Sequence, residues 1–317
     1  PAALALALAL AACGGSNGSP SSPPDPPGEA TPVEVPARGS AATFDVATWN
    51  VEWFGDPGNG PDDEGLQLQR VREVVSGADL DLWGVQEVVA EAAFATLVAG
   101  LPGYAGFLAN ASSVEGGAAW YSDFGDQEQK VGLIYKASAV EVLGARIILT
   151  EQDHAFAGRP PLEVQVRLTL GSAPLEAVVV VLHAKAGAAV EDWERRRVAA
   201  QALRSYLDAT WPDAPVWVIG DFNDDVDTSI VTGRATPYAS FLEAGSGWAF
   251  PTMALSQAGT PSTVGYADVI DHHLVSDEVL ALYQAGSAEA YLLNAIVPRY
   301  GETTSDHYPV LARYGVN

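Results

Sequence analysis

Residues 175–185 read LEAVVVVLHAK, and this run gives the strongest indication of how the chain folds. Its run of β-branched side chains predicts a buried strand over Leu175–His183. A second apolar run, Val216–Gly220, reads VWVIG and is followed by the polar residues DFND at 221–224. Both runs end in side chains that can do chemistry, so we expect a functional rim where these strands end.

Further strands are predicted on either side of this stretch. They are Thr43–Trp49, Leu82–Gln86, Val131–Lys136, Leu162–Leu170, Val269–Val275 and Tyr308–Arg313. Helical spacing appears at Leu66–Ser76, at 88–99 and at Glu191–Thr210, where the charged run Glu194–Arg197 is interpreted as a solvated face. Many strands with few helices predict an α+β fold in which sheet packs on sheet and helices lie outside.

The composition limits the class of protein. The chain of 317 residues has 40 acidic and 16 basic side chains, a formal charge of −24, which excludes a basic protein that coats nucleic acid. With 48% hydrophobic residues the chain can bury a sizeable core. Its single cysteine, Cys13, excludes an intrachain disulfide and a cysteine-based zinc site.

The first 41 residues differ in composition from the rest. The apolar run 1–12 ends at Cys13 in the sequence LAAC, which resembles the lipobox of an exported bacterial lipoprotein; a plain secretory signal is the alternative. We therefore expect export to the cell envelope with a lipid anchor on Cys13. Residues 14–41 are rich in Gly, Ser and Pro and are expected to form a disordered tether, leaving 42–317 as one domain.

Polar clusters follow or interrupt the apolar runs. They are Asn50–Glu52, Gln86–Glu87, His183–Lys185, Gly220–Asp224, Asp268–His273 and Ser305–His307. Strand ends converge on one rim of a layered fold, so we expect these side chains to share one pocket. Carboxylates are hard oxygen ligands that suit Mg²⁺ or Mn²⁺, and an imidazole beside them can bind phosphate or move a proton.

Seven short segments, taken in order along the chain, resemble the endonuclease/exonuclease/phosphatase superfamily. They read TWNVEWF, WGVQEV, GRPPL, LHAKAG, VIGDFND, VIDHHLVSD and TSDHYPV and span about residues 43–315. The resemblance implies a four-layer α/β/β/α sandwich of two mixed sheets flanked by helices. It also implies hydrolysis of phosphoester bonds with a divalent cation, Mg²⁺ or Mn²⁺, with Ca²⁺ as a further possibility.

The resemblance assigns a role to each motif residue. It implies metal binding by Asn50, Glu52, Glu87 and Asp306. It implies catalysis by His183, by Asp221 and Asn223, which position water and phosphate, and by His307, which Asp271 orients. It implies phosphate contacts for Arg159, and the placement of Lys185 two residues after His183 on the same strand side favours the same role.

Each assignment has a structural alternative. Asn50 could form a turn, Glu87 could cap the helix at 88–99, and His183 could be a hydrogen-bonded core histidine. If Asp271 faces the pocket, His273 shares its side of the strand and His272 points away. The acids at 224, 225 and 227 are interpreted as a solvated turn, because their spacing departs from a calcium-binding loop.

The leading functional hypothesis is an exported, monomeric, divalent-metal-dependent phosphodiesterase that is nuclease-like. Alternatives are a phosphomonoesterase or a phospholipase C of the same fold, acting on an inositol phosphate or sphingomyelin, and a non-catalytic surface binding module. The substrate is a nucleic acid, a phospholipid or a small phosphate ester, and the membrane is a partner through the anchor. With only 3 lysines, Lys130, Lys136 and Lys185, long duplex DNA is disfavoured.

Overall fold

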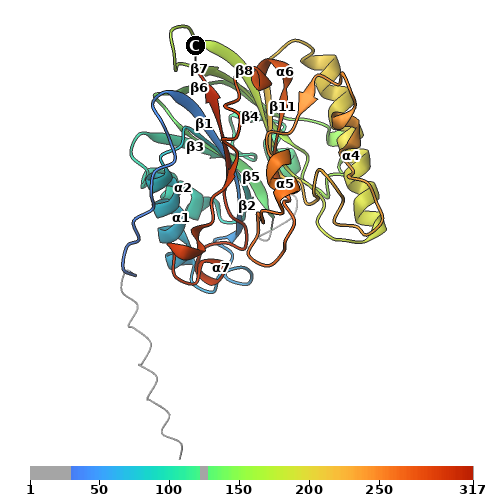
Figure 1. Ribbon diagram of the computed structural model, residues 1–317. Helices are drawn as coiled ribbons and strands as arrows, with labels where there is room; N and C mark the ends of the chain where they lie inside the picture. The colour runs from blue at the N-terminus through green and yellow to red at the C-terminus, as the bar shows by residue number, and fades with distance from the viewer. Residues whose placement is uncertain (1–29, 122–127, 317) are drawn as a thin grey trace, which may run out of the picture. The chain divides into compact units, whose positions relative to one another are not determined.

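Two β-sheets lie face to face in the computed structural model, which describes residues 30–121 and 128–316 (Figure 1). In the described residues the first sheet has six strands in the order β12-β13-β1-β2-β5-β3. In chain order their bounds are β1 Thr43–Phe54, β2 Leu82–Val88, β3 Tyr104–Leu108, β5 Lys130–Lys136, β12 Glu289–Ala290 and β13 Val310–Gly315.

The second sheet has seven strands in the described part, in the order β10-β11-β9-β8-β7-β6-β4. In chain order their bounds are β4 Val114–Glu115, β6 Val140–Ile147, β7 Leu162–Leu168, β8 Leu175–His183, β9 Val216–Asp221, β10 Trp248–Ala249 and β11 Asp271–Ser276. Both sheets are mixed, because β1 pairs with β2 and β8 with β9 in parallel while most other pairs are antiparallel. The predicted α+β class is therefore confirmed.

Helices cover the outer faces of the two sheets. The α-helices are α1 Glu64–Ala78, α2 Glu91–Ala99, α3 Gly117–Tyr121, α4 Val190–Thr210, α5 Met253–Ala258, α6 Asp277–Leu280 and α7 Tyr300–Thr303. Short 3₁₀ turns are η2 Thr150–Gln152, η3 Ala239–Leu242 and η4 Leu293–Ala295. In the described residues no helix is long and apolar enough to cross a membrane.

Three hydrophobic clusters separate the four layers. One packs α1 and α2 on the first sheet, the second fills the space between the sheets, and the third packs α4 on the second sheet. The valine run of β8 does not alternate with polar residues because both faces of the strand are buried. Val179 and Val181 belong to the cluster between the sheets, while Val178 and Val180 belong to the cluster that packs α4. This burial on both faces confirms the predicted sandwich.

The strand registers bring the polar ends together. Helix α1 connects the parallel pair β1–β2 and α4 connects the parallel pair β8–β9, so the carboxyl ends within each pair lie at one edge. His183 at the end of β8 is paired with Asp221 at the end of β9, and Asp221 with Asp271 at the start of β11. At this edge His183 and Asp221, which lie 38 positions apart in the sequence, become neighbours. Asp221 and Asp271, which lie 50 positions apart, do so as well.

The compact unit begins earlier than predicted. It starts at Pro32, and Val35 is buried in the cluster beneath α1. Tyr291 donates a hydrogen bond to the carbonyl of Pro36 at 2.7 Å, and Arg38 pairs with Glu289 at 2.9 Å. Residues 32–41 are therefore part of the domain rather than of the expected tether. Cys13 and residues 1–29 lie outside the described residues.

Strand prediction was accurate where burial is two-sided and poor at the sheet edges. Strands β11 and β13 begin two residues later than predicted, at Asp271 and Val310. The edge or near-edge strands β3, β4, β6, β10 and β12 have no predicted counterpart. Such strands are short or interrupted by glycine, and their pairing with a neighbour, rather than their own pattern, makes them strands.

Candidate active site

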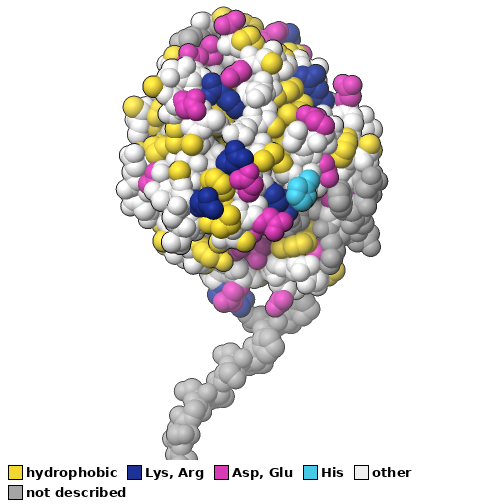
Figure 2. All heavy atoms as spheres, turned by 90° about the vertical axis from the view of Figure 1, so that its right-hand side faces the viewer, with side chains coloured by type: hydrophobic (Ala, Val, Ile, Leu, Met, Phe, Trp, Pro, Cys, Tyr) yellow, Lys and Arg dark blue, Asp and Glu magenta, His cyan; other side chains and the backbone are white. Residues whose placement is uncertain are grey.

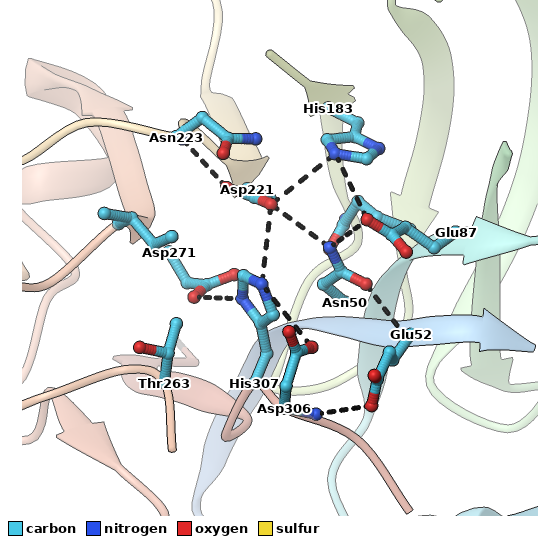
Figure 3. A network of polar contacts seen from close by, with 12 residues as sticks. Asn50, Glu52, Glu87, His183, Asp221, Asn223, Thr263, Asp271, Asp306 and His307 are labelled. Carbon is cyan, nitrogen blue, oxygen red and sulfur yellow. Dashed lines mark hydrogen bonds and ion pairs between the residues drawn. The ribbon is translucent and has the colours of Figure 1, made fainter. Parts of the chain in front are cut away.

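Ten predicted site residues meet at this edge of the sandwich (Figure 3). Nine of them are labelled in the figure: Asn50, Glu52, Glu87, His183, Asp221, Asn223, Asp271, Asp306 and His307. The tenth, Arg159, donates to the carbonyl of Ala184, the residue after His183, at 3.2 Å. They line or support a cavity of about 460 Å³. Among the predicted active-site residues in the described part of the chain, only Lys185 turns away from this cavity.

The backbone has an unusual conformation at three residues of the site. Glu52, Glu87 and Asn223 adopt left-handed φ angles of 47°, 61° and 52°. Such angles are rare for residues with a side chain and cost free energy, so the surrounding structure must hold them. Gln67 on α1 does so for β1, because its amide donates to the carbonyls of Val51 at 2.9 Å and Glu52 at 2.8 Å.

Asn50 lies inside β1 and links the two sheets at the site. Its amide nitrogen donates to Glu87 Oε1 at 3.0 Å and to Asp221 Oδ2 at 3.1 Å. Asn50 also has the predicted turn-forming role, because its Oδ1 accepts a hydrogen bond from the backbone nitrogen of Glu52 at 3.0 Å. The alternative that Glu87 caps a helix is wrong, because α2 begins at Glu91 with Ala90 at its N-cap.

His307 is held by a buried carboxylate. Asp271 Oδ2 lies 2.8 Å from His307 Nδ1, which leaves Nε2 facing Asp221 Oδ2 at 3.9 Å. Burial alone lowers the pKa of His307, but the negative charges of Asp271 and Asp221 outweigh it and raise this pKa well above its ordinary value. This shift favours the imidazolium form of His307, whose Nε2 faces Asp221.

His183 approaches the same carboxylate from the other side. Its Nε2 lies 3.5 Å from Asp221 Oδ2 and 3.7 Å from Glu87 Oε1, while Nδ1 has no hydrogen-bond partner among the described residues. It is thus not a hydrogen-bonded core histidine. Burial lowers the pKa of His183 well below its ordinary value, and the positive charges of Arg159 and His307 lower it further. The two histidines therefore differ in charge.

Asp221 is fully buried between the histidines. Burial raises its pKa to about 7, with the charge of Asp271 adding to the shift and the charge of His307 opposing it. The backbone nitrogen of Asn223 donates to Asp221 Oδ1 at 2.8 Å, and the Asn223 amide donates to the carbonyl of Ala184 at 3.1 Å. Asp221 is thus positioned with one oxygen fixed by the backbone and the other facing both imidazoles.

Three carboxylates form an acidic cup beside the histidines, which we define as Glu52, Glu87 and Asp306. Glu52 accepts a hydrogen bond from the backbone nitrogen of Asp306 at 2.9 Å. Burial, together with the negative charges of Asp306 and Glu87, raises the pKa of Glu52 to about 7. Crowded carboxylates of this kind are stabilised by a cation, and their hard oxygens are the donors that Mg²⁺ and Mn²⁺ prefer.

The donor set therefore fits a divalent cation. A second group of potential donors, Asp221, Asp271 and His307, has ligand atoms within 4.8 Å of one another. In that group His307 Nδ1 already bonds to Asp271, so a cation would have to displace the hydrogen bond that orients the imidazole. The acidic cup, with Asn50 beside it, is the better match.

The two predicted phosphate contacts differ. Arg159 is within reach of the site's charges but donates to Gln129 and to the Ala184 carbonyl, and burial lowers its pKa. Lys185 is not a cavity residue, because its ammonium pairs with Asp192 at 2.9 Å. Its placement shows that strand alternation, from which we expected it to face the pocket, ends with β8 at His183.

Two segments predicted to be solvated each contain buried charged residues, so those predictions are wrong in part, although Glu194 and Asp227 are exposed. Arg196 in the run 194–197 is fully buried and pairs with Asp224, which is also fully buried, at 2.7 Å. Asp225 is buried as well and accepts from the backbone nitrogen of Val269 at 3.1 Å. These contacts fasten the loop after β9, and helical spacing cannot identify them because their partners lie on other elements.

The neighbouring histidines are structural. His272 contacts Thr252 and the carbonyl of Val269, both at 2.9 Å, on the opposite side of β11 from Asp271. His273 contacts the Tyr314 hydroxyl and the Val310 carbonyl, both at 3.1 Å. The prediction that His272 points away is confirmed, and neither imidazole lines the cavity.

Sequence reasoning missed the residues that support His307. Ser305 donates to the carbonyl of Asn50 at 2.7 Å and accepts from the backbone nitrogen of His307 at 2.9 Å. Ser262 accepts from the backbone nitrogen of Ile270 at 2.9 Å. The cavity wall also includes Thr263 and Tyr266. Only Ser305 had a signal, since it directly precedes the acid and the histidine.

Solved structures with the same fold were found. The catalytic domain of human Nocturnin has a TM-score of 0.59 at 16% identity, covering 87% of this chain and 95% of that chain. D. rerio TDP2, complexed with single strand DNA product, has a TM-score of 0.57 at 14% identity, covering 87% and 100%. A mannosyl-6-phosphatase from Bacteroides thetaiotaomicron has a TM-score of 0.54 at 18% identity, covering 85% and 98%.

A search of curated proteins gave no match. The family model of the Endonuclease/Exonuclease/phosphatase family, in contrast, matches residues 47–307, from β1 to the histidine that Asp271 orients. A match over this span includes strands of both sheets and all ten residues of the site. The chain therefore belongs to the Endonuclease/Exonuclease/phosphatase family and is a divalent-metal-dependent phosphoester hydrolase.

Proposed function

We propose that this protein is a Mg²⁺- or Mn²⁺-dependent phosphodiesterase that hydrolyses its substrate by in-line attack of water. The observation that carries the proposal is the position of Asp221 Oδ2, which faces the Nε2 atoms of His183 at 3.5 Å and His307 at 3.9 Å. A charged imidazole, a neutral imidazole and a carboxylate thus face one space. That combination suits proton transfer at a phosphoester.

His307 has the role of acid and charge stabiliser. Its raised pKa keeps a proton on Nε2, where it can neutralise a phosphate oxygen or be given to the leaving oxygen. Asp271 holds the ring through Nδ1 and so fixes which nitrogen faces the substrate. Asp221, fixed through the backbone of Asn223, orients the attacking water and accepts its proton.

A cation bound by Glu87 and Asp306, with Asn50 and Glu52 in support, would neutralise charge on the phosphate oxygens. His183, which is neutral, contributes a hydrogen bond rather than a charge. Its burial against Glu87 and Asp221 keeps water away from the carboxylates on that side. The division of charge between the two histidines matches a substrate that carries one negative charge at the scissile phosphate.

Charge also favours a small diester over a monoester or duplex DNA. Among the cavity residues in the described part, none is Lys or Arg. All three lysines are paired with acids: Lys130 with Glu128, Lys136 with Asp79 and Asp81, and Lys185 with Asp192. On the face that carries α4, basic side chains are scattered among acidic ones rather than gathered into a patch (Figure 2). A polyanion therefore gains little from this surface.

The test compares bis(p-nitrophenyl) phosphate with p-nitrophenyl phosphate, in Mg²⁺, in Mn²⁺ and with EDTA. We expect metal-dependent hydrolysis that prefers the diester, and a loss on the order of 10²- to 10⁴-fold in kcat for His307→Ala. Asp306→Ala should raise the metal concentration needed. His154→Ala, which removes an exposed imidazole, is the control. Faster hydrolysis of the monoester would favour a phosphomonoesterase, and hydrolysis of neither would overturn the proposal.

We also propose that Cys13 carries a lipid that anchors the exported enzyme in the cell envelope. The sequence LAAC after an apolar run supports it. One lipidated residue with more than one acyl chain gives stable membrane attachment, whereas a single chain does not. In full-length chains expressed in a bacterium, Cys13→Ser should move the protein from the membrane fraction to the supernatant. An unchanged distribution would exclude the anchor.

A further inference from the structure

The active-site cavity continues beyond the catalytic residues as an apolar wall. Next to Asp221 and Asn223 it is lined by Ile230 and Ile270, and by the small residues of the segment 186–188. These positions supply neither charge nor hydrogen bonds from their side chains. A group of the substrate that lies against them must therefore be apolar or flat, because burying a charged group there would leave it unpaired.

Tyr266 lines the same cavity as these residues. Its side chain is 71% exposed, the highest value among the exposed large hydrophobic residues of the described part. A single exposed tyrosine on a protein surface needs no explanation. Tyr266 differs because it lines the same cavity as His307 and Asp221, so its free ring is available to whatever is bound there.

The turn that carries Tyr266 is fixed to the catalytic segment. The backbone nitrogen of Val264 donates to the carbonyl of Asp306 at 2.7 Å, and that of Tyr308 donates to the carbonyl of Ser262 at 2.7 Å. Thr263 forms an isolated β-bridge with His307 and its hydroxyl accepts from the backbone nitrogen of Tyr266 at 3.2 Å. Figure 3 places Thr263 beside His307 and Asp271. The ring is therefore presented at a defined place relative to the scissile phosphate.

The negative charge of Asp268, two residues after Tyr266, further restricts the class of ligand that fits the cavity. Asp268, also a cavity residue, is exposed and carries a carboxylate, which accepts hydrogen bonds from N–H and O–H groups and repels a second phosphate. An acyl chain offers no such donors. A nucleobase offers both a flat face for Tyr266 and N–H groups at its edge.

We propose that Tyr266, Ile230 and Ile270 form a subsite for the nucleobase of a mononucleotide-sized phosphoester. The proposal rests on the phosphodiesterase function proposed above and names its substrate class. The base stacks on Tyr266, Asp268 accepts from its edge, and the phosphate reaches His307. Flanking phosphates of a longer polynucleotide would lie on the acidic rim, where nothing neutralises them.

Binding distinguishes this subsite from the reaction itself. The full domain in Mg²⁺ is titrated calorimetrically with thymidine 5′-monophosphate and with 2-deoxyribose 5-phosphate, which share the phosphate and the sugar and differ in the presence of the base. We expect the nucleotide to bind about tenfold more tightly, since stacking of one base on an aromatic side chain contributes this much or more. Tyr266→Ala should remove the difference, and Tyr266→Phe should keep most of it.

Two controls exclude indirect effects. Val264→Ala alters an exposed residue of the same turn, which does not line the cavity, and should leave both affinities within about twofold. The thermal unfolding midpoint of Tyr266→Ala should equal that of the wild type, because the ring is mostly exposed. Equal binding of both ligands by the wild type, or an unchanged preference in Tyr266→Ala, would overturn the subsite. Absence of diester hydrolysis would instead overturn the proposed function.

Discussion

Arg196 on α4 and Asp224 after β9 form a fully buried ion pair, in which the guanidinium donates to Asp224 Oδ2 through Nε at 2.9 Å and Nη2 at 2.7 Å. The remaining nitrogen, Nη1, donates to the carbonyls of Lys185 and Gly187, both at 2.8 Å. Asp224 Oδ1 accepts from the backbone nitrogen of Ile230 at 2.8 Å. One side chain thus joins the loops that follow β8 and β9, which are two walls of the active site.

Removing this guanidinium should destabilise the protein strongly. Arg196→Met leaves the carboxylate of Asp224 buried without its partner, and the breaking of a buried pair costs about 3–5 kcal/mol. Arg197→Met is the matched control, because Arg197 lies next along α4 and pairs with Glu194 at the surface, where a pair contributes at most about 1 kcal/mol. The free energy of unfolding in urea measures both.

The variant Arg196→Lys tests whether a positive charge at this position is sufficient for activity or whether the hydrogen bonds of the guanidinium are also needed. A lysine keeps the charge but cannot bond to Asp224 and to both carbonyls at once. We expect a folded protein whose kcat falls while its fold, measured by circular dichroism, is retained. Equal unfolding free energies for Arg196→Met and Arg197→Met would contradict the buried pair.

Divalent metal should stabilise the folded protein through the acidic cup. Mg²⁺ or Mn²⁺ that binds only the native state raises its stability, by about 2.7 kcal/mol at one hundred times the dissociation constant. The thermal unfolding midpoint of the wild type should therefore rise on metal addition and fall back with EDTA. Glu87→Gln removes a central carboxylate and should abolish most of this rise. Glu115→Gln, which neutralises an exposed acid on β4, should respond like the wild type.

Acid should destabilise the protein through His273. Burial lowers the pKa of His273 to about 4 from an ordinary value of 6.5, so the folded state keeps this ring neutral where the unfolded state binds a proton. Stability is unaffected above about pH 6.5 and falls as the pH drops towards 4, by about 3 kcal/mol in total from this group. Unfolding free energies measured between pH 7 and pH 4 test this fall.

Two variants test whether His273 causes the loss of stability at low pH. His273→Gln retains an amide that can bond to the Val310 carbonyl but cannot be protonated, so the slope of stability with pH should be shallower. His154→Gln changes an exposed histidine and should leave the slope as in the wild type. A slope that persists unchanged in His273→Gln would show that other groups, such as His183 and His272, whose pKa values burial also lowers, control acid unfolding.

The acidic rim should determine how the enzyme treats polyanions. Asp268→Lys replaces a carboxylate at the cavity by an ammonium, and we expect kcat/KM on a single-stranded oligonucleotide to rise several-fold at low salt. The gain should shrink as salt increases, because screening weakens contacts between exposed charges. Hydrolysis of bis(p-nitrophenyl) phosphate, which carries one charge, is the reference. An oligonucleotide rate that does not respond to Asp268→Lys would contradict a role for rim charge.

The fold class and the chemistry of the site could be predicted from local patterns of residues. The valine run of β8 and the apolar runs before each polar cluster identify buried strands, because burial on both faces leaves a strong local pattern. The residue types that follow those strands, acids with amides and histidines, then indicate a metal-dependent phosphoesterase. These properties are local, and a local pattern is visible without neighbours.

Which of these residues contact one another depends on how the elements pack and could not be predicted from those patterns. Asp271 and His307 lie 36 residues apart, and antiparallel pairing of β11 with β9 is what places Asp271 beside the buried Asp221. The same limit explains why Arg196 was expected in solvent and Lys185 in the pocket. The partners of both, Asp224 and Asp192, are set by how α4 packs on the second sheet. Charge pairing depends on distance in space, which residue spacing along a chain does not encode.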